Sequence, residues 1–271
     1  MTSNILSFSR SVTGLGRCDG NVQIAPAINI PVNRSDRSIR VLSASVSSNI
    51  PNVFTTNDFS NARCNVSRDD GASWKTVVLP NGIYSVAQLS AAINSACAED
   101  AWWTDASDAG FTIGVNLVTD YLWMRVDSTK LAVAGQLRID FAESSMNELT
   151  GFMVPHAFIV DGLYSANAAA QMDWFGNRVS VLVSGFGAIS YKNNDESYEI
   201  CTIPLSSSAT VNEYLFPLEG TVSPHIRATG ISNTVRSYGV SFIGSRLNAD
   251  GSPRQLYIFD GDVSLYLELR F

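Results

Sequence analysis

Apolar and polar residues alternate along most of the chain, which is the pattern of a β-strand with one buried face. The clearest case is the final segment, where Val263, Leu265, Leu267 and Leu269 are separated by Ser264 and other polar or amphipathic residues. The same pattern predicts further strands at residues 28–32, 39–47, 75–79, 111–118, 121–127, 131–141, 179–184, 198–205, 211–218 and 235–246.

Turn residues separate these strands, as in Asn81-Gly82, Asn193-Asn194 and Asp260-Gly261. Glycine and asparagine tolerate positive φ, so these positions reverse the chain at little cost. Many short strands with regular turns indicate an all-β fold, an antiparallel sandwich or barrel.

One segment near residues 85–97 has helical spacing instead. Ser85 stands where an N-cap is expected and Gln88 follows three residues later, as a capping box requires. Val86, Leu89 and Ile93 then recur on one face. We therefore predict a single amphipathic helix inserted between strands.

Residues 1–20 contain Ser, Thr, Gly and Arg without sustained periodicity, and we interpret them as an N-terminal arm. Residues 21–271 are expected to form one elaborated domain. The alternative is two domains divided near residues 155–175.

Charged residues are only 16% of the chain, against roughly 25% in soluble domains, and the formal net charge is −7. Such a surface favours packing against other protein. The basic residues are nearly all arginines, which are preferred where a charge lies at a protein contact. Candidate interface arginines cluster near the N-terminus: Arg10, Arg17, Arg34, Arg37 and Arg40. A weak genome contact through the arm is one interpretation, and a solvated terminus is the other.

Adjacent Trp102 and Trp103 are the best candidates for an exposed aromatic contact, because a regular element would turn at least one ring outward. The exposed contact would be with sugar or with protein, but packing against a helix end is the interpretation that we favour for this pair. Trp123 lies within a strand pattern and is expected in the core.

Little in the sequence indicates catalysis. The two histidines, His156 and His225, each follow a proline in loop-like sequence without a nucleophile elbow. Phosphate-binding glycine motifs and metal-site cysteine spacing are missing, so we predict no enzyme activity, no cofactor and no metal. The four cysteines are expected to be buried or free thiols in a reducing compartment.

The sequence begins without the basic flank and apolar stretch of a signal peptide, and it contains no run of eighteen apolar residues. We therefore expect no membrane span and a location in an aqueous intracellular space.

Several segments in succession resemble jelly-roll capsid proteins of the adenovirus, virophage and polinton-like lineage. The segment Leu79–Val86 resembles a "strand, proline-glycine turn, tyrosine, short helix" signature of that group. The other matching segments are Val41–Val46 with Asn49–Val53 and Thr56–Phe59, Glu148–Phe152, Tyr238–Gly251 and Asp260–Asp262.

The resemblance implies a jelly-roll β-sandwich and a structural role in the virion. A penton-like subunit that assembles with itself, with neighbouring capsid proteins and with a spike or fibre is the first expectation. A double jelly-roll major capsid protein forming trimers is the second. A spike or other carbohydrate- or receptor-binding sandwich is the third.

Overall fold

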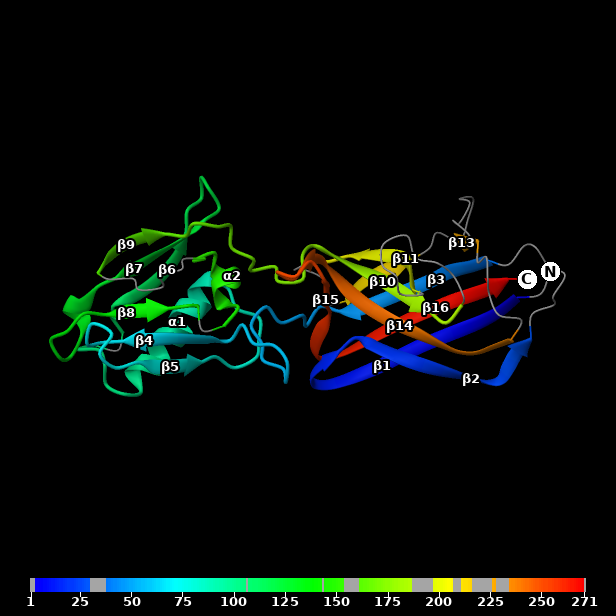
Figure 1. Cartoon of the computed structure of the whole chain (residues 1–271), viewed down its shortest axis with the longest axis horizontal. Helices are drawn as coiled ribbons and strands as arrows, with labels where there is room; N and C mark the ends of the chain where they lie inside the picture. The colour runs from blue at the N-terminus through cyan, green and yellow to red at the C-terminus, as the bar shows by residue number, and fades with distance from the viewer. Residues whose placement is uncertain are drawn as a thin grey trace. The chain divides into compact units, whose positions relative to one another are not determined.

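The computed structural model describes residues 3–29, 38–105, 107–142, 144–153, 161–186, 197–206, 211–215, 226–227 and 234–270 (Figure 1). The chain divides into two compact units. Unit 1 combines Met1–Ile50 with Phe175–Phe271, and unit 2 is Pro51–Trp174. Unit 2 is therefore an insertion in the sequence of unit 1.

The described residues of unit 1 form two antiparallel sheets of five strands each. The first sheet has the order β1 (Ser3–Arg17), β16 (Tyr257–Arg270), β3 (Ser38–Ser47) and β12 (Val211–Leu215), with β13 (Ile226–Arg227) also paired to β3. The second has the order β11 (Ser197–Pro204), β10 (Arg178–Ser184), β14 (Thr234–Leu247) and β15 (Pro253–Gln255), with β2 (Asp19–Asn29) also paired to β14.

The core of unit 1 lies between these sheets. Leu265, Leu267 and Leu269 of β16 are buried, as the alternation predicts. Phe8 of β1 and Phe242 of β14 meet across the core, with their ring centroids 6.4 Å apart. The all-β antiparallel sandwich is confirmed, and it agrees with the predicted jelly-roll class.

Two chain segments pass from one sheet to the other at a shared corner. The backbone N–H of Cys18, between β1 and β2, donates to the carbonyl of Leu256 at 3.0 Å. Leu256, between β15 and β16, in turn donates to Phe242. Figure 1 shows β1 and β16 running side by side from this corner.

The predicted arm at residues 1–20 is corrected by the structure, because Ser3–Arg17 form a strand paired with β16 over its length. Leu6, Phe8 and Val12 are buried on its inner face. The alternation of buried and exposed side chains in β1 was hard to detect in the sequence for two reasons. Arg10 occupies an inward phase of the pattern, and the register shifts between Val12 and Leu15.

Unit 2 has shorter elements. One three-stranded sheet has the order β5 (Lys75–Val78), β4 (Arg63–Ser67) and β8 (Arg138–Asp140), and the other has the order β6 (Phe111–Val115), β7 (Leu122–Val126) and β9 (Gly162–Ser165). The helices are α1 (Val86–Ala98), α2 (Met146–Thr150) and a 3-10 turn at Ser128–Lys130. The strand predicted at 131–141 is therefore much shorter than expected.

Helix α1 confirms the predicted inserted helix and its capping box. Gln88 donates its backbone N–H to the Ser85 hydroxyl at 3.2 Å, and Ser85 N–H donates to the Gln88 side chain at 2.8 Å. A hydrogen bond connects the helix to β6: the hydroxyl oxygen of Ser90 accepts from the N–H of Ile113 at 3.2 Å. Leu89 and Ile93 are fully buried.

Candidate functional site

The N-terminal arginines that the structure describes are held by carboxylates of unit 1. Arg17 contacts Asp19 at 2.9 Å, and Arg10 contacts both the carboxylate and the backbone carbonyl of Asp19. These contacts join β1 to the start of β2. Arg34 and Arg37 lie outside the described residues. The interface role and the genome contact predicted for this cluster both stay predictions.

Arg40 belongs to a charged group on the first sheet of unit 1. Its guanidinium lies 2.7 Å from the Glu268 carboxylate, which also lies 3.0 Å from Nε of Arg270. Burial alone would raise the pKa of Glu268, but the hydrogen bond from Arg270 and the charge of Arg40 outweigh it and lower the pKa. Glu268 is therefore a buried anion between two cations.

Trp102 and Trp103 are both buried, 6% and 7% exposed, so neither ring makes the exposed contact for which the pair was a candidate. Trp103 donates its indole N–H to the carbonyl of Asn94 on α1 at 3.0 Å. The Arg68 guanidinium lies 5.6 Å from the ring centroid of Trp102. The pair follows the C-terminal end of α1 and packs there, which agrees with the favoured interpretation.

Trp123 was predicted to lie in the core, but it lies on the outer face of the sheet β6-β7-β9. Leu122, Met124 and Val126 of β7 are buried, so Trp123 and Arg125 point to the opposite face. Trp123 pairs with Gly114 of β6. A side chain at position 114 would collide with the Cζ2 and Cε2 atoms of the indole.

This outer face is hollowed, with a volume of about 690 Å³. Leu163 of β9 pairs with Arg125 across the sheet and is 70% exposed. The hollow is lined by Trp123, Arg125, Val126, Asp127, Gly162 and Leu163.

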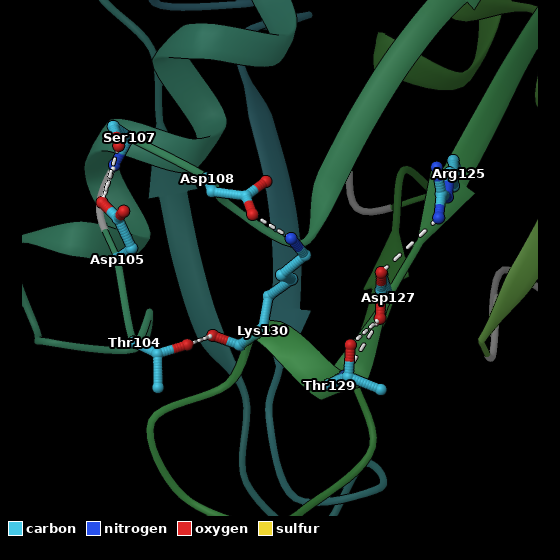
Figure 2. Close-up of polar contacts among 8 residues, drawn as sticks. All are labelled: Thr104, Asp105, Ser107, Asp108, Arg125, Asp127, Thr129 and Lys130. Atoms are coloured by element: carbon cyan, nitrogen blue, oxygen red, sulfur yellow. Dashed lines mark hydrogen bonds and ion pairs between the residues drawn. The ribbon is translucent and has the colours of Figure 1, made fainter.

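Polar side chains at the end of β7 and in the loop after it contact one another (Figure 2), and two of them, Arg125 and Asp127, line the hollow. Asp127 lies 3.6 Å from Arg125 and accepts hydrogen bonds from the backbone and hydroxyl of Thr129. The hydrogen bond from the Thr129 side chain is the main cause that lowers the pKa of Asp127. Nearby, Lys130 pairs with Asp108. The loop that follows β7 is thus cross-linked by charged and hydroxyl groups.

The turn between β6 and β7 presents two large apolar side chains, Leu117 at 90% and Val118 at 91% exposure. The turn is well ordered by hydrogen bonds: Asn116 N–H donates to the Tyr121 carbonyl at 2.8 Å, and the Asn116 side chain accepts from Val118 N–H at 3.0 Å. These two adjacent apolar side chains are available for contact with another protein.

The four cysteines are free and buried, as predicted for their thiols. Burial raises the pKa of Cys18, Cys97 and Cys201 to about 12, so these thiols are protonated at neutral pH. His156 and His225 lie outside the described residues. No helix in the described part of the chain combines the length and apolar character needed to span a bilayer.

Comparison with known proteins gave two kinds of result. No protein-family model matches the sequence, and no curated protein sequence matches it. Among solved structures, the chain is similar to the mavirus penton protein, with a TM-score of 0.44, 8% identity and coverage of 98% of this chain and 99% of that one. It is also similar to a chain of the Sputnik virophage, with a TM-score of 0.42, 10% identity and coverage of 98% and 97%.

Proposed function

We propose that this protein is a structural subunit of a virus capsid, penton-like, which assembles with copies of itself at icosahedral vertices and contacts neighbouring capsid proteins. The observation that carries the proposal is the signature segment Leu79–Val86, whose turn, tyrosine and capped helix have the local structure that the resemblance implies. Tyr84 Oη donates to the Pro80 carbonyl at 3.0 Å across the turn, and α1 begins at Val86.

Other segments of the resemblance support the proposal in the same way. Gly151 ends α2 with a φ of 79°, the left-handed conformation that a leucine-glycine-phenylalanine turn requires. Tyr238–Leu247 lies in β14, as a strand of the last hairpin requires. Asp260-Gly261 was predicted as a turn between strands, and that prediction is wrong: both residues lie within β16, opposite the register shift of β1, so they do not add support.

The edge of the first sheet in unit 1 supports assembly with other chains. Among the described strands, only β16 pairs with β1, so the other edge of β1 offers backbone donors and acceptors. Natural edge strands are usually short or carry charges, whereas β1 has fifteen residues and only Arg10 and Arg17 are charged. An edge of this kind suits pairing with a neighbouring subunit.

The proposed mechanism is physical. A head-to-tail interface between identical subunits forms a ring when its rotation closes, and five copies close at an icosahedral vertex. The low charge of the chain reduces the desolvation cost of such an interface. The proposed location is the virion, with assembly inside the host cell, and no enzymatic step is required.

Mass photometry of the purified chain at micromolar concentration tests this function, with negative-stain images as the second measurement. Rings of five copies are expected. Trimers would replace the penton-like assignment by the major-capsid alternative. Monomers alone at every concentration tested would contradict both.

A further inference from the structure

We propose that the outer face of β6-β7-β9 in unit 2 is a carbohydrate-binding site, in which the Trp123 indole stacks on the apolar face of a neutral pyranose. This inference goes beyond the assembly function and gives the particle a surface that recognises glycans. It rests on three features of the hollow described above.

The first feature is the position of the indole. The ring reaches from β7 across β6, where Gly114 leaves the space that any other residue would fill. The indole therefore lies over the backbone of β6 at Gly114, and it lines the hollow. A flat aromatic surface with limited freedom is suited to the C–H face of a sugar ring, because apolar area is buried there at little conformational cost.

The second feature is the polar pair beside the ring. Arg125 offers N–H donors and Asp127 offers carboxylate acceptors, 3.6 Å apart at their nearest atoms. Sugar hydroxyls both donate and accept, so such a pair serves adjacent hydroxyls of one sugar. The hydrogen bonds from Thr129 to Asp127 hold the carboxylate in place before a ligand arrives.

The third feature is size and charge. A hollow of about 690 Å³ lies within the range of about 300–1,000 Å³ that is usual for small-ligand sites. Among the described residues, its lining has one cation and one anion, a balance that does not favour a sialylated or sulfated glycan. The chain as a whole, at −7, repels polyanions such as nucleic acid.

The test begins with the full chain on a glycan array that carries neutral hexose and N-acetylhexosamine oligosaccharides beside their sialylated and sulfated counterparts. Binding to neutral glycans is expected, and Trp123→Ala should weaken it by about tenfold or more. Trp74→Ala is the matched control, because Trp74 is a partly buried tryptophan of the same unit outside the hollow. This variant should bind like the unmodified protein.

A second variant retains Trp123 but displaces its indole ring. Gly114→Ala adds a methyl group where the ring lies, so it should weaken glycan binding while the circular dichroism spectrum is unchanged. Quenching or a blue shift of tryptophan fluorescence on titration with the best neutral array glycan should appear in the unmodified chain and in Trp74→Ala, but not in Trp123→Ala.

Three outcomes would overturn the inference: no array glycan is bound, only anionic glycans are bound, or Trp123→Ala and Gly114→Ala bind as well as the unmodified chain. Capture of a capsid protein instead of a glycan by this face would also overturn it. Mass photometry of the same variants separates the two proposals. Intact rings without glycan binding contradict this inference alone, and glycan binding by a permanent monomer contradicts the assembly function alone.

Discussion

The core of unit 1 is built from long strands whose alternate side chains are buried, whereas unit 2 joins short strands through helices, turns and side-chain hydrogen bonds. β14 and β16 each span fourteen residues, while no described strand of unit 2 exceeds five. The outer surface of unit 2 also carries the hollow at Trp123 and the apolar turn at Leu117 and Val118.

This difference indicates a division of labour. Long paired strands bury apolar area repeatedly and fix one register, which is suited to a rigid building block. Loops on a stable scaffold vary at lower cost and are the usual place for recognition. We expect mutations in the core of unit 1 to affect stability most, and mutations on the outer surface of unit 2 to affect binding or association.

The largest expected effect is that of Phe242→Ala in unit 1. Phe242 is fully buried against Phe8, so its truncation should cost about 3–5 kcal/mol in free energy of unfolding. Urea unfolding followed by circular dichroism measures the loss. Phe259→Ala is the control, because Phe259 is an exposed phenylalanine of the same unit. Equal losses for the two variants would contradict the assignment of the core.

Glu268→Gln should have the next largest effect. It removes the anion between Arg40 and Arg270 and should cost about 1.5–3 kcal/mol, the usual range for hydrogen bonds to charged groups. Glu213→Gln, on an exposed position of β12, should cost much less.

The Glu268 effect should depend on pH. Because the folded state lowers the pKa of Glu268 below its ordinary value of 4.5, the stabilisation is complete above pH 4.5 and is lost as pH falls through the folded pKa. Urea midpoints of the unmodified chain and Glu268→Gln should therefore converge in acid. A difference that stays constant down to pH 2 would exclude the carboxylate as its source.

A smaller effect is expected from Ser85→Ala in unit 2, about 1 kcal/mol, because the N-cap acceptor of α1 is lost. Ser95→Ala, on an exposed position of the same helix, should be neutral or slightly stabilising. Thermal unfolding of both variants measures this. If Ser95→Ala were the more damaging change, the capping box would not contribute as described.

The smallest effect on stability is expected from replacing Leu117 and Val118 together by serine, within about 0.5 kcal/mol, since both side chains are exposed. Association of subunits, measured by mass photometry, should weaken. Val133→Ser, at another exposed apolar position of unit 2, is the control and should leave assembly unchanged. Assembly of the double variant at wild-type concentrations would exclude the turn from the subunit contact.

Local patterns predicted much of the fold. The alternation at residues 263–269 and the capping box at Ser85 are both present, because each depends on neighbours within a few residues. The arm prediction failed where one charged residue and a bulge interrupted the alternation of β1. For Trp102 and Trp103, adjacency suggested exposure, but an indole hydrogen bond to Asn94 and packing at the helix end bury both.

The site at Trp123 was missed although a signal was present. Leu122, Met124 and Val126 already occupy the buried phase of β7, so period two places Trp123 on the other face. The residues beside Trp123 on that face include Gly114 and Leu163, which belong to other strands and cannot be identified from the alternation of β7.

By itself, the sequence determined the fold class, the inserted helix and the buried side chains of strands such as β10 and β16, because these depend on periodicity and on local hydrogen bonds. Only the tertiary structure decided that Ser3–Arg17 complete a sheet, that Trp102 and Trp103 are buried, and that Trp123, Arg125 and Asp127 border one hollow. The reason is physical: strand pairing brings together residues far apart in the chain, and their partners are set by the register of the whole sheet.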